Sequence, residues 1–302
     1  MSDINFLDNA VQGKNSWARY FLTIVISVIG GTFASLLFIV LFMIIYFLSS
    51  GISGVEVQMN ILNYNPLLIL VLVGISYGIY SLLFYLCIRF IHKKKFLSLI
   101  NTGKNIKWNR ILKGAGLWAG IMGIFTLMSL MFHENNLSLN FNPGSFLLLL
   151  ILSFLVFPIQ ASFEEIFFRG YLMQAIGLIT KKPVVPIILT SLIFGVVHFF
   201  NGTNVTTSIT IVFSATILGL MLGIIVLGEN GLETAMGAHI ANNMYVAVVF
   251  NTSDSGLGGL PSLITTETTD PLSGIPWLIS MASVMIIILF WNKKEDLFRI
   301  FR

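Results

Sequence analysis

The sequence predicts an all-α, polytopic integral membrane protein with eight transmembrane helices. Of its 302 residues, 56% are hydrophobic and only 10% are charged, whereas an ordinary soluble domain carries about 25% charged residues. The apolar residues gather in long runs, and a helix that crosses a bilayer needs about 20 of them. Lysine and arginine occur in some loops between these runs and are missing from others, which is typical of a membrane protein with a fixed orientation.

Eight apolar runs are interpreted as membrane spans. The predicted spans are Tyr20–Leu48, Leu67–Ile91, Gly114–Phe132, Phe146–Thr180, Val185–Phe200, Ser208–Leu227, Leu232–Phe250 and Ile275–Trp291. The fourth run is long and carries an acidic motif, and the fifth is short. The first run is too long for the core of a signal peptide and has no small-residue cleavage site after it. We therefore expect it to be retained as a helix.

The distribution of basic residues predicts how these spans are oriented. Basic residues occupy the N-terminal segment, loops 92–110 and 181–184, and the C-terminal segment. The predicted outer loops 49–66, 133–145, 201–207 and 251–274 have no lysine or arginine, and loop 228–231 carries only Glu229. Eight spans place every basic loop on one side of the membrane, and basic loops stay in the cytoplasm. The sequence therefore predicts a multi-pass protein of the cell membrane with both termini cytoplasmic.

The spans and motifs divide the chain into three regions. Residues 1–145 are expected to form an N-terminal membrane region with three helices, and residues 146–251 a core that carries the polar motifs. Residues 252–302 are expected to form an outer loop and the last helix. Segment 253–274 is rich in Gly, Ser, Thr and Pro, so we expect an exposed loop there. The sequence has no internal repeat and gives no support to an inverted-repeat transporter.

Cysteine content and net charge limit the function classes further. The single cysteine, Cys87, permits no internal disulfide and no thiolate metal cluster. The net charge of +4 comes from the loops and reports orientation in a membrane protein. The expected partners are therefore the lipid bilayer and a membrane-associated peptide or protein substrate, and no nucleic acid is expected.

The most informative feature is a pair of adjacent carboxylates, Glu164 and Glu165, in the fourth span. A charge at bilayer depth costs from about 3 to more than 10 kcal/mol, so such residues are rare and usually functional. Glu165 and Arg169 are four residues apart and are expected to pair on one helix face. Glu164 points about 100° away and cannot share this partner equally. A carboxylate left free in a protein-lined cavity is suited to act as a general base.

Two further polar motifs lie in or near the ends of spans. His198 ends the motif Phe-x-x-x-His in the fifth span, and His239 and Asn243 share one helix face in the seventh. Glu164 and His198 both lie roughly 20–25 Å along their helices from the turn near residue 181. His239 lies about 12–15 Å from the turn at 228–231. We expect Glu164, His198 and His239 to meet in one cavity, with His239 the looser match.

These side chains favour hydrolysis as the chemistry. A carboxylate and a histidine can hold and deprotonate a water molecule, and a second histidine and an asparagine amide can donate hydrogen bonds to an oxyanion. Alternatively, Glu164, His198 and His239 bind a divalent metal such as zinc, which activates the water. The adjacent glutamates lack the spacing that places two zinc ligands on one turn, so direct activation is favoured and a metal is left open.

Each motif also has an interpretation without catalysis. The first motif can be an ion-pair cluster that anchors a helix end, and His198 alone can be a histidine of the outer interface. His239 and Asn243 can serve as hydrogen-bonding groups between helices. A proton relay from Glu164 to His198 in a transporter is a further alternative. The occurrence of all three motifs in one chain favours catalysis.

The three motifs together resemble a known family. Glu-Glu-x-x-Phe-Arg-Gly from Glu164, Phe-x-x-x-His ending at His198, and His-x-x-x-Asn from His239 each lie on their own span. This order is similar to that of the CAAX protease and bacteriocin-processing (CPBP, or Abi) family of intramembrane proteases. The motifs cover residues 164–243, and the rest of the chain resembles the family only as an eight-span membrane protein.

The resemblance implies a role for each motif residue. Glu164 would activate the hydrolytic water with the help of His198, His239 and Asn243 would stabilise the oxyanion, and Glu165 and Arg169 would order the site. The family is described as metalloproteases, and a glutamate-dependent mechanism without a tightly bound metal has also been proposed for it. Its members remove three residues from prenylated proteins, process peptides, confer bacteriocin self-immunity or act as scaffolds that do not cut. The resemblance thus implies an intramembrane CAAX-type endopeptidase, with a scaffold or immunity protein as the alternative.

Overall fold

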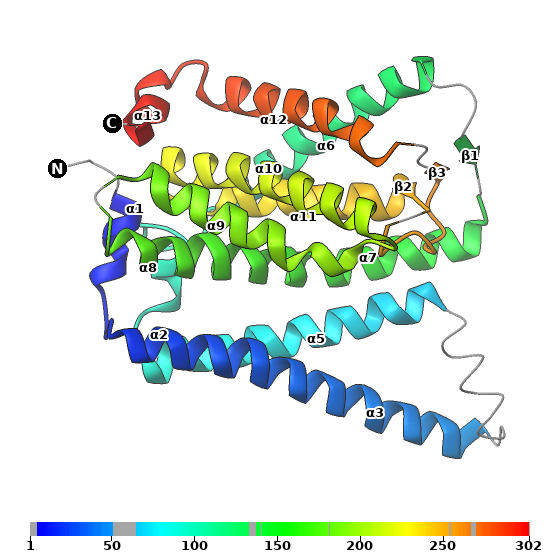
Figure 1. Cartoon of the computed structure of the whole chain (residues 1–302), viewed down its shortest axis with the longest axis horizontal. Helices are drawn as coiled ribbons and strands as arrows, with labels where there is room; N and C mark the ends of the chain where they lie inside the picture. Colours follow the sequence, from blue (N-terminus) through cyan, green and yellow to red (C-terminus); the bar gives the residue numbers. More distant parts are fainter. Residues whose placement is uncertain are drawn as a thin grey trace.

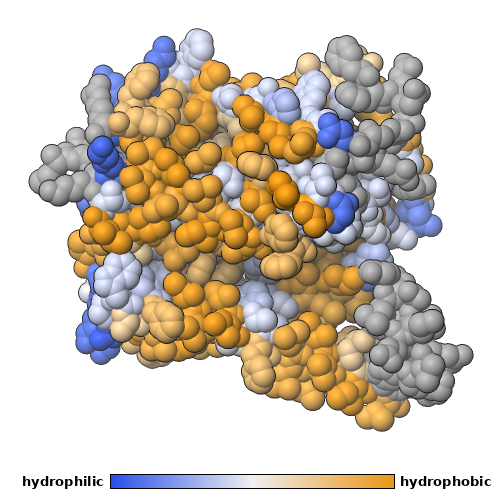
Figure 2. Space-filling view, viewed as in Figure 1, coloured by the Kyte–Doolittle hydropathy of each residue, from blue (hydrophilic) through white to orange (hydrophobic). Residues whose placement is uncertain are grey.

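The computed structural model describes residues 5–50, 65–132, 137–139, 141–180, 182–253, 255–266 and 270–301. Its helices run along one common direction as a bundle, and both termini lie at the same end (Figure 1). Large apolar side chains face outward, including Phe33 and Ile45, which are 71% and 66% exposed. Figure 2 shows that apolar residues cover the middle of the visible face, while hydrophilic residues gather towards its two ends. This distribution fits a bilayer as the solvent of the bundle, and the chain is a multi-pass membrane protein.

Six helical segments of the described chain are long and apolar enough to cross a bilayer. They are Trp17–Ile45, Pro66–Ile91, Trp108–Met131, Pro143–Gly177, Val184–Asn201 and Val205–Glu229. The last two predicted spans correspond to the shorter helices α11 (Glu233–Val248) and α12 (Gly274–Phe290), of 16 and 17 residues. Such helices are about 24–26 Å long, less than the roughly 30 Å of a bilayer core. The predicted helical, polytopic class is confirmed, and the number of eight spans stays a prediction.

Several of the spans contain a π-helical segment, in which the turn is one residue wider than in an α-helix. Residues Val25–Gly30 join α2 (Trp17–Ile24) to α3 (Gly31–Ser50), and Cys87–Ile91 extend α5 (Pro66–Leu86). Residues Ile166–Leu172 join α7 (Pro143–Glu165) to α8 (Met173–Gly177). The other helices are α1 (Asn5–Asp8), α6 (Trp108–Phe132), α9 (Val184–Val197), α10 (Val205–Glu229) and α13 (Lys294–Phe298). Short 3-10 turns cover Asn9–Val11, Phe96–Leu99, Phe199–Asn201, Pro271–Ser273 and Arg299–Phe301.

The centre of the bundle consists of α7, α9, α10 and α11. Helix α11 packs against α6 and α7, and α10 packs against α9, α11 and α12. Helix α5 packs between α7 and α3. Helix α3 lies at the edge of the bundle and diverges from α5 towards the end opposite the termini (Figure 1). The helices that carry the three polar motifs are therefore central, and the first span is peripheral.

Helices α6 and α11 approach each other closely because each contributes a glycine to the contact. A Cβ atom added to Gly237 would lie 1.9 Å from the carbonyl oxygen of Ile111, and one added to Gly114 would lie 2.1 Å from that of Thr234. Both obstacles are backbone atoms, which cannot rotate away as a side chain can. Small residues of this kind allow helix backbones to pack together in a membrane. This contact sets the position of α11 in the bundle.

A small three-stranded sheet lies at the end of the bundle opposite the termini (Figure 1). Strand β3 (Ile264–Thr266) pairs antiparallel with β1 (Leu137–Leu139) and parallel with β2 (Phe250–Thr252). The expectation of a wholly exposed loop at 253–274 is wrong for part of this segment, because Leu260 and Ile264 are buried. These two side chains are covered because the strand pairing draws the segment onto the ends of the helices. Residues 254 and 267–269 of this segment lie outside the described residues.

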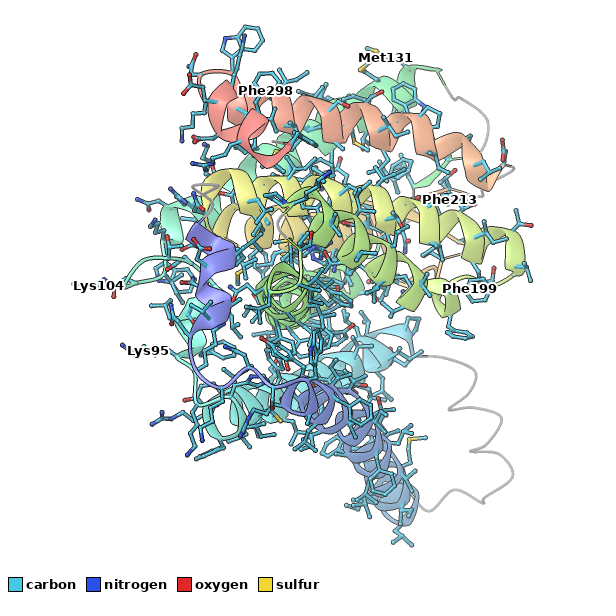
Figure 3. All side chains as sticks on the ribbon, turned by 60° about the vertical axis from the view of Figure 1, so that its left-hand side comes forward. Lys95, Lys104, Met131, Phe199, Phe213 and Phe298 are labelled. Atoms are coloured by element: carbon cyan, nitrogen blue, oxygen red, sulfur yellow. The ribbon has the colours of Figure 1, made fainter. Side chains whose placement is uncertain are left out.

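The loop between α5 and α6 packs onto the end of the bundle where the two termini lie. Lys95 and Lys104 project from this end (Figure 3). Lys94, in contrast, is buried and donates to Gln174 Oε1 on α8 at 2.8 Å, and burial lowers its pKa to about 8. Gln174 in turn donates to the carbonyl of Ser98 at 2.9 Å. The basic loop therefore forms a fixed cover over this end of the bundle.

The two ends of the bundle give a direct test of orientation. We expect Lys104→Cys to be cytoplasmic and Ser253→Cys, which follows β2, to lie outside, each in a Cys87→Ser background. A membrane-impermeant maleimide added to intact cells should label position 253 and spare position 104 until the cells are lysed. The physical reason is the retention of basic loops in the cytoplasm. Labelling of position 104 without lysis contradicts the orientation.

The glycine contact between α6 and α11 predicts a stability difference. Gly237→Ala should destabilise the protein by about 1–3 kcal/mol, because the added methyl group meets a backbone carbonyl and forces the helices apart. Gly120→Ala on α6 is the control, since a Cβ atom there meets nothing within 4 Å. The thermal unfolding midpoint in detergent measures both changes. Equal midpoints for the two variants contradict the close approach.

Candidate active site

Glu165 and Arg169 form a fully buried ion pair where α7 passes into its π-helical segment. Arg169 Nη1 donates to Glu165 Oε1 at 2.8 Å, and both side chains are 0% exposed. The pairing predicted from their spacing is confirmed. Two charges removed from water are stable only when further hydrogen bonds support them. The contacts of this pair with His239 and Phe194 therefore help to stabilise the fold and also shape the site.

His239 on α11 joins the ion pair to the second carboxylate. Its Nδ1 lies 2.7 Å from Glu165 Oε1, and its Nε2 lies 3.5 Å from Glu164 Oε2. An ionised carboxylate can only accept, so Nδ1 donates to Glu165. In the neutral ring Nε2 is then an acceptor, and its lone pair is turned towards Glu164. One imidazole thus contacts both carboxylates and contributes no net charge unless it gains a proton.

Glu164 is held by only one of its two oxygens. The hydroxyl of Tyr77 on α5 donates to Glu164 Oε1 at 2.5 Å, and Gln160 Nε2 lies 3.4 Å from the same oxygen. Glu164 Oε2 is buried and has no hydrogen-bond partner among the described residues. The side chain of Glu164 is 4% exposed. Glu164 therefore presents a bonded oxygen to α5 and an unbonded oxygen to His239.

Phe194 on α9 connects this group to His198. Its ring centroid lies 4.3 Å from Arg169 Cζ and 5.7 Å from the centroid of the His239 ring. A desolvated cation–π contact of this kind contributes about 2 kcal/mol. The His198 ring lies 4.5 Å from the Phe194 ring, and His198 Nδ1 donates to the Phe194 carbonyl at 2.7 Å. His198 is half-buried and keeps its Nε2 for other partners.

A chain of amides on α11 orients Asn243. Trp118 Nε1 on α6 donates to Asn242 Oδ1 at 3.1 Å, and Asn242 Nδ2 donates to Asn243 Oδ1 at 3.1 Å. Both asparagines are half-buried, and Trp118 is fully buried. The Nδ2 of Asn243 is left as a donor, without a hydrogen-bond partner in the described chain. Asn243 lies one turn beyond His239 on the same helix, as its spacing predicted.

The six predicted residues fall into two groups in the structure. One group is joined by ion pairs and consists of Glu164, Glu165, Arg169 and His239. The other two, His198 and Asn243, lie beside it. None of the hydrogen bonds or ion pairs of Glu164 in the described chain involves His198. His239, the looser match by helical depth, is the histidine that contacts Glu164. The meeting of His198 with both residues in one cavity stays a prediction.

The depth of α11 explains why counting along the helices misplaced His239. Leu232, just before α11, donates its backbone N–H to the carbonyl of Ile100 at 2.8 Å. Glu233, the first residue of α11, is 0% exposed and accepts from Asn101 Nδ2 at 2.5 Å. Helix α11 thus begins beneath the cover formed by the basic loop, deeper than a turn at the membrane surface. His239 consequently reaches the level of the carboxylates.

Two polar residues of the site were not among the predictions, Tyr77 and Gln160. Gln160 lies four residues before Glu164 on α7 and shares its helix face, so its spacing was a usable signal. Tyr77 lies in an apolar run 87 residues before Glu164. No local pattern distinguishes it from the neighbouring aromatic residues. Only the packing of α5 against α7 brings its hydroxyl to the carboxylate.

The predicted metal-binding set is not assembled as a cation site. Among the described residues, no group of three or more His, Cys, Asp and Glu side chains is arranged to hold a metal ion. His239 uses Nδ1 on Glu165, and the His198 ring contacts Phe194 and has no hydrogen bond to either carboxylate in the described chain. A divalent ion needs several ligand atoms that converge on one point. As placed, the residues do not fit a metal ion, and a metal stays a prediction from the sequence.

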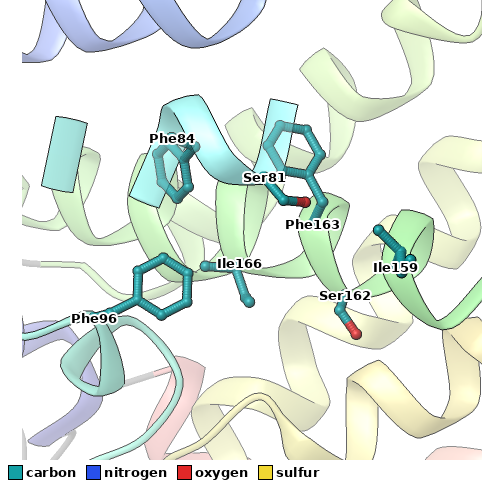
Figure 4. A pocket seen from close by; sticks show the side chains of 7 residues that line it. All are labelled: Ser81, Phe84, Phe96, Ile159, Ser162, Phe163 and Ile166. Atoms are coloured by element: carbon teal, nitrogen blue, oxygen red, sulfur yellow. The ribbon is translucent and has the colours of Figure 1, made fainter. Parts of the chain in front are cut away.

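An apolar pocket adjoins the turn of α7 that carries Glu164 (Figure 4). It lies between α5, α7 and the 3-10 turn Phe96–Leu99 and has a volume of about 190 Å³. The lining residues are Ser81, Phe84, Phe96, Ile159, Ser162, Phe163 and Ile166. None of these side chains is charged, so the pocket suits an apolar group. Phe163 also packs against Tyr77, with ring centroids 5.8 Å apart, which connects the pocket to the site.

Comparison with known proteins covers both the motif region and the whole chain. Residues 143–245, which include all six predicted site residues, match the family model described as type II CAAX prenyl endopeptidase Rce1-like. Over 297 residues the chain is 29% identical to the uncharacterized protein YyaK of Bacillus subtilis (strain 168), covering 97% of this chain and 98% of that protein. No solved structure matches the chain. Tyr77 lies outside the region that the family model matches.

The buried ion pair predicts a large effect of losing its negative charge. Glu165→Gln should destabilise the protein by about 3–5 kcal/mol, because it leaves Arg169 charged and unpaired in the interior. The matched control is Asp296→Asn, since Asp296 is 41% exposed and lies 3.6 Å from Arg299. The control should change stability by at most about 1 kcal/mol. Thermal unfolding in detergent compares the two, and a small, equal change in both contradicts the role of Glu165.

Proposed function

We propose that this chain, which belongs through residues 143–245 to the Rce1-like family of CAAX endopeptidases, is an intramembrane endopeptidase. It hydrolyses peptide bonds in membrane-associated proteins or peptides with a water molecule activated by Glu164. It resides in the cell membrane with both termini in the cytoplasm. The observation that carries this proposal is the unbonded Oε2 of Glu164, buried and 3.5 Å from the acceptor Nε2 of His239.

The charges around Glu164 support a role as general base. Arg169 is paired with Glu165, so these two charges cancel. Glu164 adds a second carboxylate without a cation of its own in the described chain. A carboxylate in a protein-lined site with one oxygen unoccupied is placed to accept a proton from water. The hydrogen bond from Tyr77 replaces part of the hydration that the Glu164 carboxylate loses on burial.

The hydrolytic step follows from this geometry. A water molecule gives one proton to Glu164 Oε2 as its oxygen forms a bond to the carbonyl carbon of the scissile peptide. The electron pair of the carbonyl moves to its oxygen and forms an oxyanion. On collapse of the tetrahedral intermediate, the carbon–nitrogen bond breaks and Glu164 returns the proton to the leaving amine. His239 Nε2 lies beside Oε2 and accepts the second O–H of the same water.

Asn243 and His198 are the residues that would donate hydrogen bonds to the oxyanion. The Nδ2 group of Asn243 is held by the amide chain from Trp118 and is the uncommitted neutral donor next to His239. A preorganised amide donor of this type contributes about 100- to 1,000-fold to the rate of acyl transfer. His198 donates through Nε2 only when it is protonated, since its Nδ1 is committed to Phe194. The amide is therefore the principal donor.

The apolar pocket beside Glu164 supports a lipid-modified or strongly apolar substrate. The family description names prenyl endopeptidases, and a prenyl group is an uncharged hydrocarbon chain. The pocket presents phenylalanine and isoleucine side chains and no charge to such a group. Ile159, which lines it, is 44% exposed on the outside of α7. A chain lying in the bilayer therefore enters the pocket from the side of the helices.

The central test is Glu164→Gln. The amide is isosteric with the carboxylate but accepts no proton, so proteolysis should fall by about 10²–10⁴-fold while folding is retained. Membrane proteins and released peptides of cells with the wild-type protein, with Glu164→Gln, and without the protein are compared by mass spectrometry. The purified substrate is then tested with both proteins, with and without a chelator.

The control for this test is Glu295→Gln, which makes the same change at an exposed residue of α13. It should process substrates as the wild type does. Substrates that accumulate in cells without the protein but are cut normally with Glu164→Gln would show a scaffold or immunity protein instead of a protease. Turnover by purified Glu164→Gln at the wild-type rate would remove Glu164 from the mechanism.

A further inference from the structure

We propose that Tyr77 is a positioning residue for hydrolysis, which holds Glu164 by Oε1 so that Oε2 alone serves as the base. This inference rests on the proposed function and extends it to a helix outside the family match. Tyr77 lies on α5, whereas the matched region begins at residue 143. The proposal makes α5 part of the catalytic apparatus rather than a packing helix.

The contact of Tyr77 with Glu164 is short and specific. The Tyr77 hydroxyl lies 2.5 Å from Glu164 Oε1, a distance typical of an O–H group donating to a charged oxygen. The ring is fixed by edge contacts with Tyr80 and Phe163, at centroid distances of 5.6 and 5.8 Å. Because the ring is held by packing, the hydroxyl is directed at the carboxylate before a substrate arrives.

The two oxygens of Glu164 are made different by this contact. A free carboxylate rotates about its last bond, and either oxygen can then meet a water molecule. Tyr77 and Gln160 both bind Oε1, and neither binds Oε2. Oε2 consequently stays on the side of His239 Nε2, 3.5 Å away. Tyr77 therefore selects the atom that accepts the proton, although it does not itself touch the substrate.

The charged and titratable groups around Glu164 come from four helices. Helix α5 contributes Tyr77, and α7 with its π-helical segment contributes Glu165 and Arg169. Helix α11 contributes His239, and α9 contributes His198 through Phe194. A hydrogen bond donated to a carboxylate favours its charged form. Loss of the Tyr77 hydroxyl removes the short hydrogen bond at Glu164 Oε1 and leaves the other charged groups in place.

The test compares Tyr77→Phe with Tyr80→Phe, both of which keep the aromatic ring. Tyr80 lies one turn further along α5, and its hydroxyl lies 3.2 Å from Thr32 Oγ1 instead of a carboxylate. In Tyr77→Phe the hydrogen bond that fixes Glu164 Oε1 is lost, so Oε2 is no longer held towards His239 Nε2. At neutral pH kcat should fall about tenfold or more, with KM little changed. Tyr80→Phe should match the wild type.

A measurement without substrate separates this inference from the proposed function. Infrared spectra record the stretching bands of carboxyl groups, which change position when a hydrogen bond to the group is lost, and Glu164→Gln identifies the band of Glu164. This band should keep its wild-type position in Tyr80→Phe and change position in Tyr77→Phe, because only Tyr77→Phe removes the hydrogen bond to Oε1. An unchanged band position in Tyr77→Phe overturns the role of Tyr77. A changed band position in a protein that cleaves nothing supports the contact and overturns only the protease.

Discussion

The structure depends above all on the burial of two adjacent carboxylates in an apolar bundle. Glu164 and Glu165 are 3% and 0% exposed, and charged groups at this depth persist only with partners. Arg169 neutralises Glu165, and His239 contacts both carboxylates from another helix. The bundle must therefore place α11 directly against α7. A protein without this contact would hold a charged cluster in a medium that cannot solvate it.

This requirement accounts for the unusual composition of α11. The helix is less apolar than the other central helices and carries a histidine and two asparagines. Such a helix is unfavourable in contact with lipid, but α11 is enclosed by α6, α7 and α10. Glycines at 114 and 237 let α6 approach closely enough to cover it. The short length of α11 follows as well, because it starts beneath the basic loop, where Glu233 is already buried.

The partners of Glu164 and Glu165 serve both the stability of the fold and the proposed chemistry. Glu165 accepts at Oε1 from Arg169 and His239, so a cation balances its charge. Glu164 accepts at Oε1 from Tyr77 and has no Lys or Arg partner in the described chain. The Oε2 atoms of both carboxylates are unbonded among the described residues, and the proposed function assigns the water to that of Glu164. Two neighbouring residues of the same type thus take different roles because their partners differ. The apolar pocket next to them extends the site towards the lipid-facing side of α7.

The sequence by itself determined the helical membrane class, the distribution of basic loops and the pairing of Glu165 with Arg169. These features depend on local composition and on the fixed spacing of one helix, which the order of residues specifies directly. The tertiary structure decided the contact of His239 with both carboxylates, the contact of His198 with Phe194 and the presence of Tyr77 in the site. They depend on how deeply α11 begins and on which face α5 turns to α7. No periodicity within a single helix encodes such relations between helices.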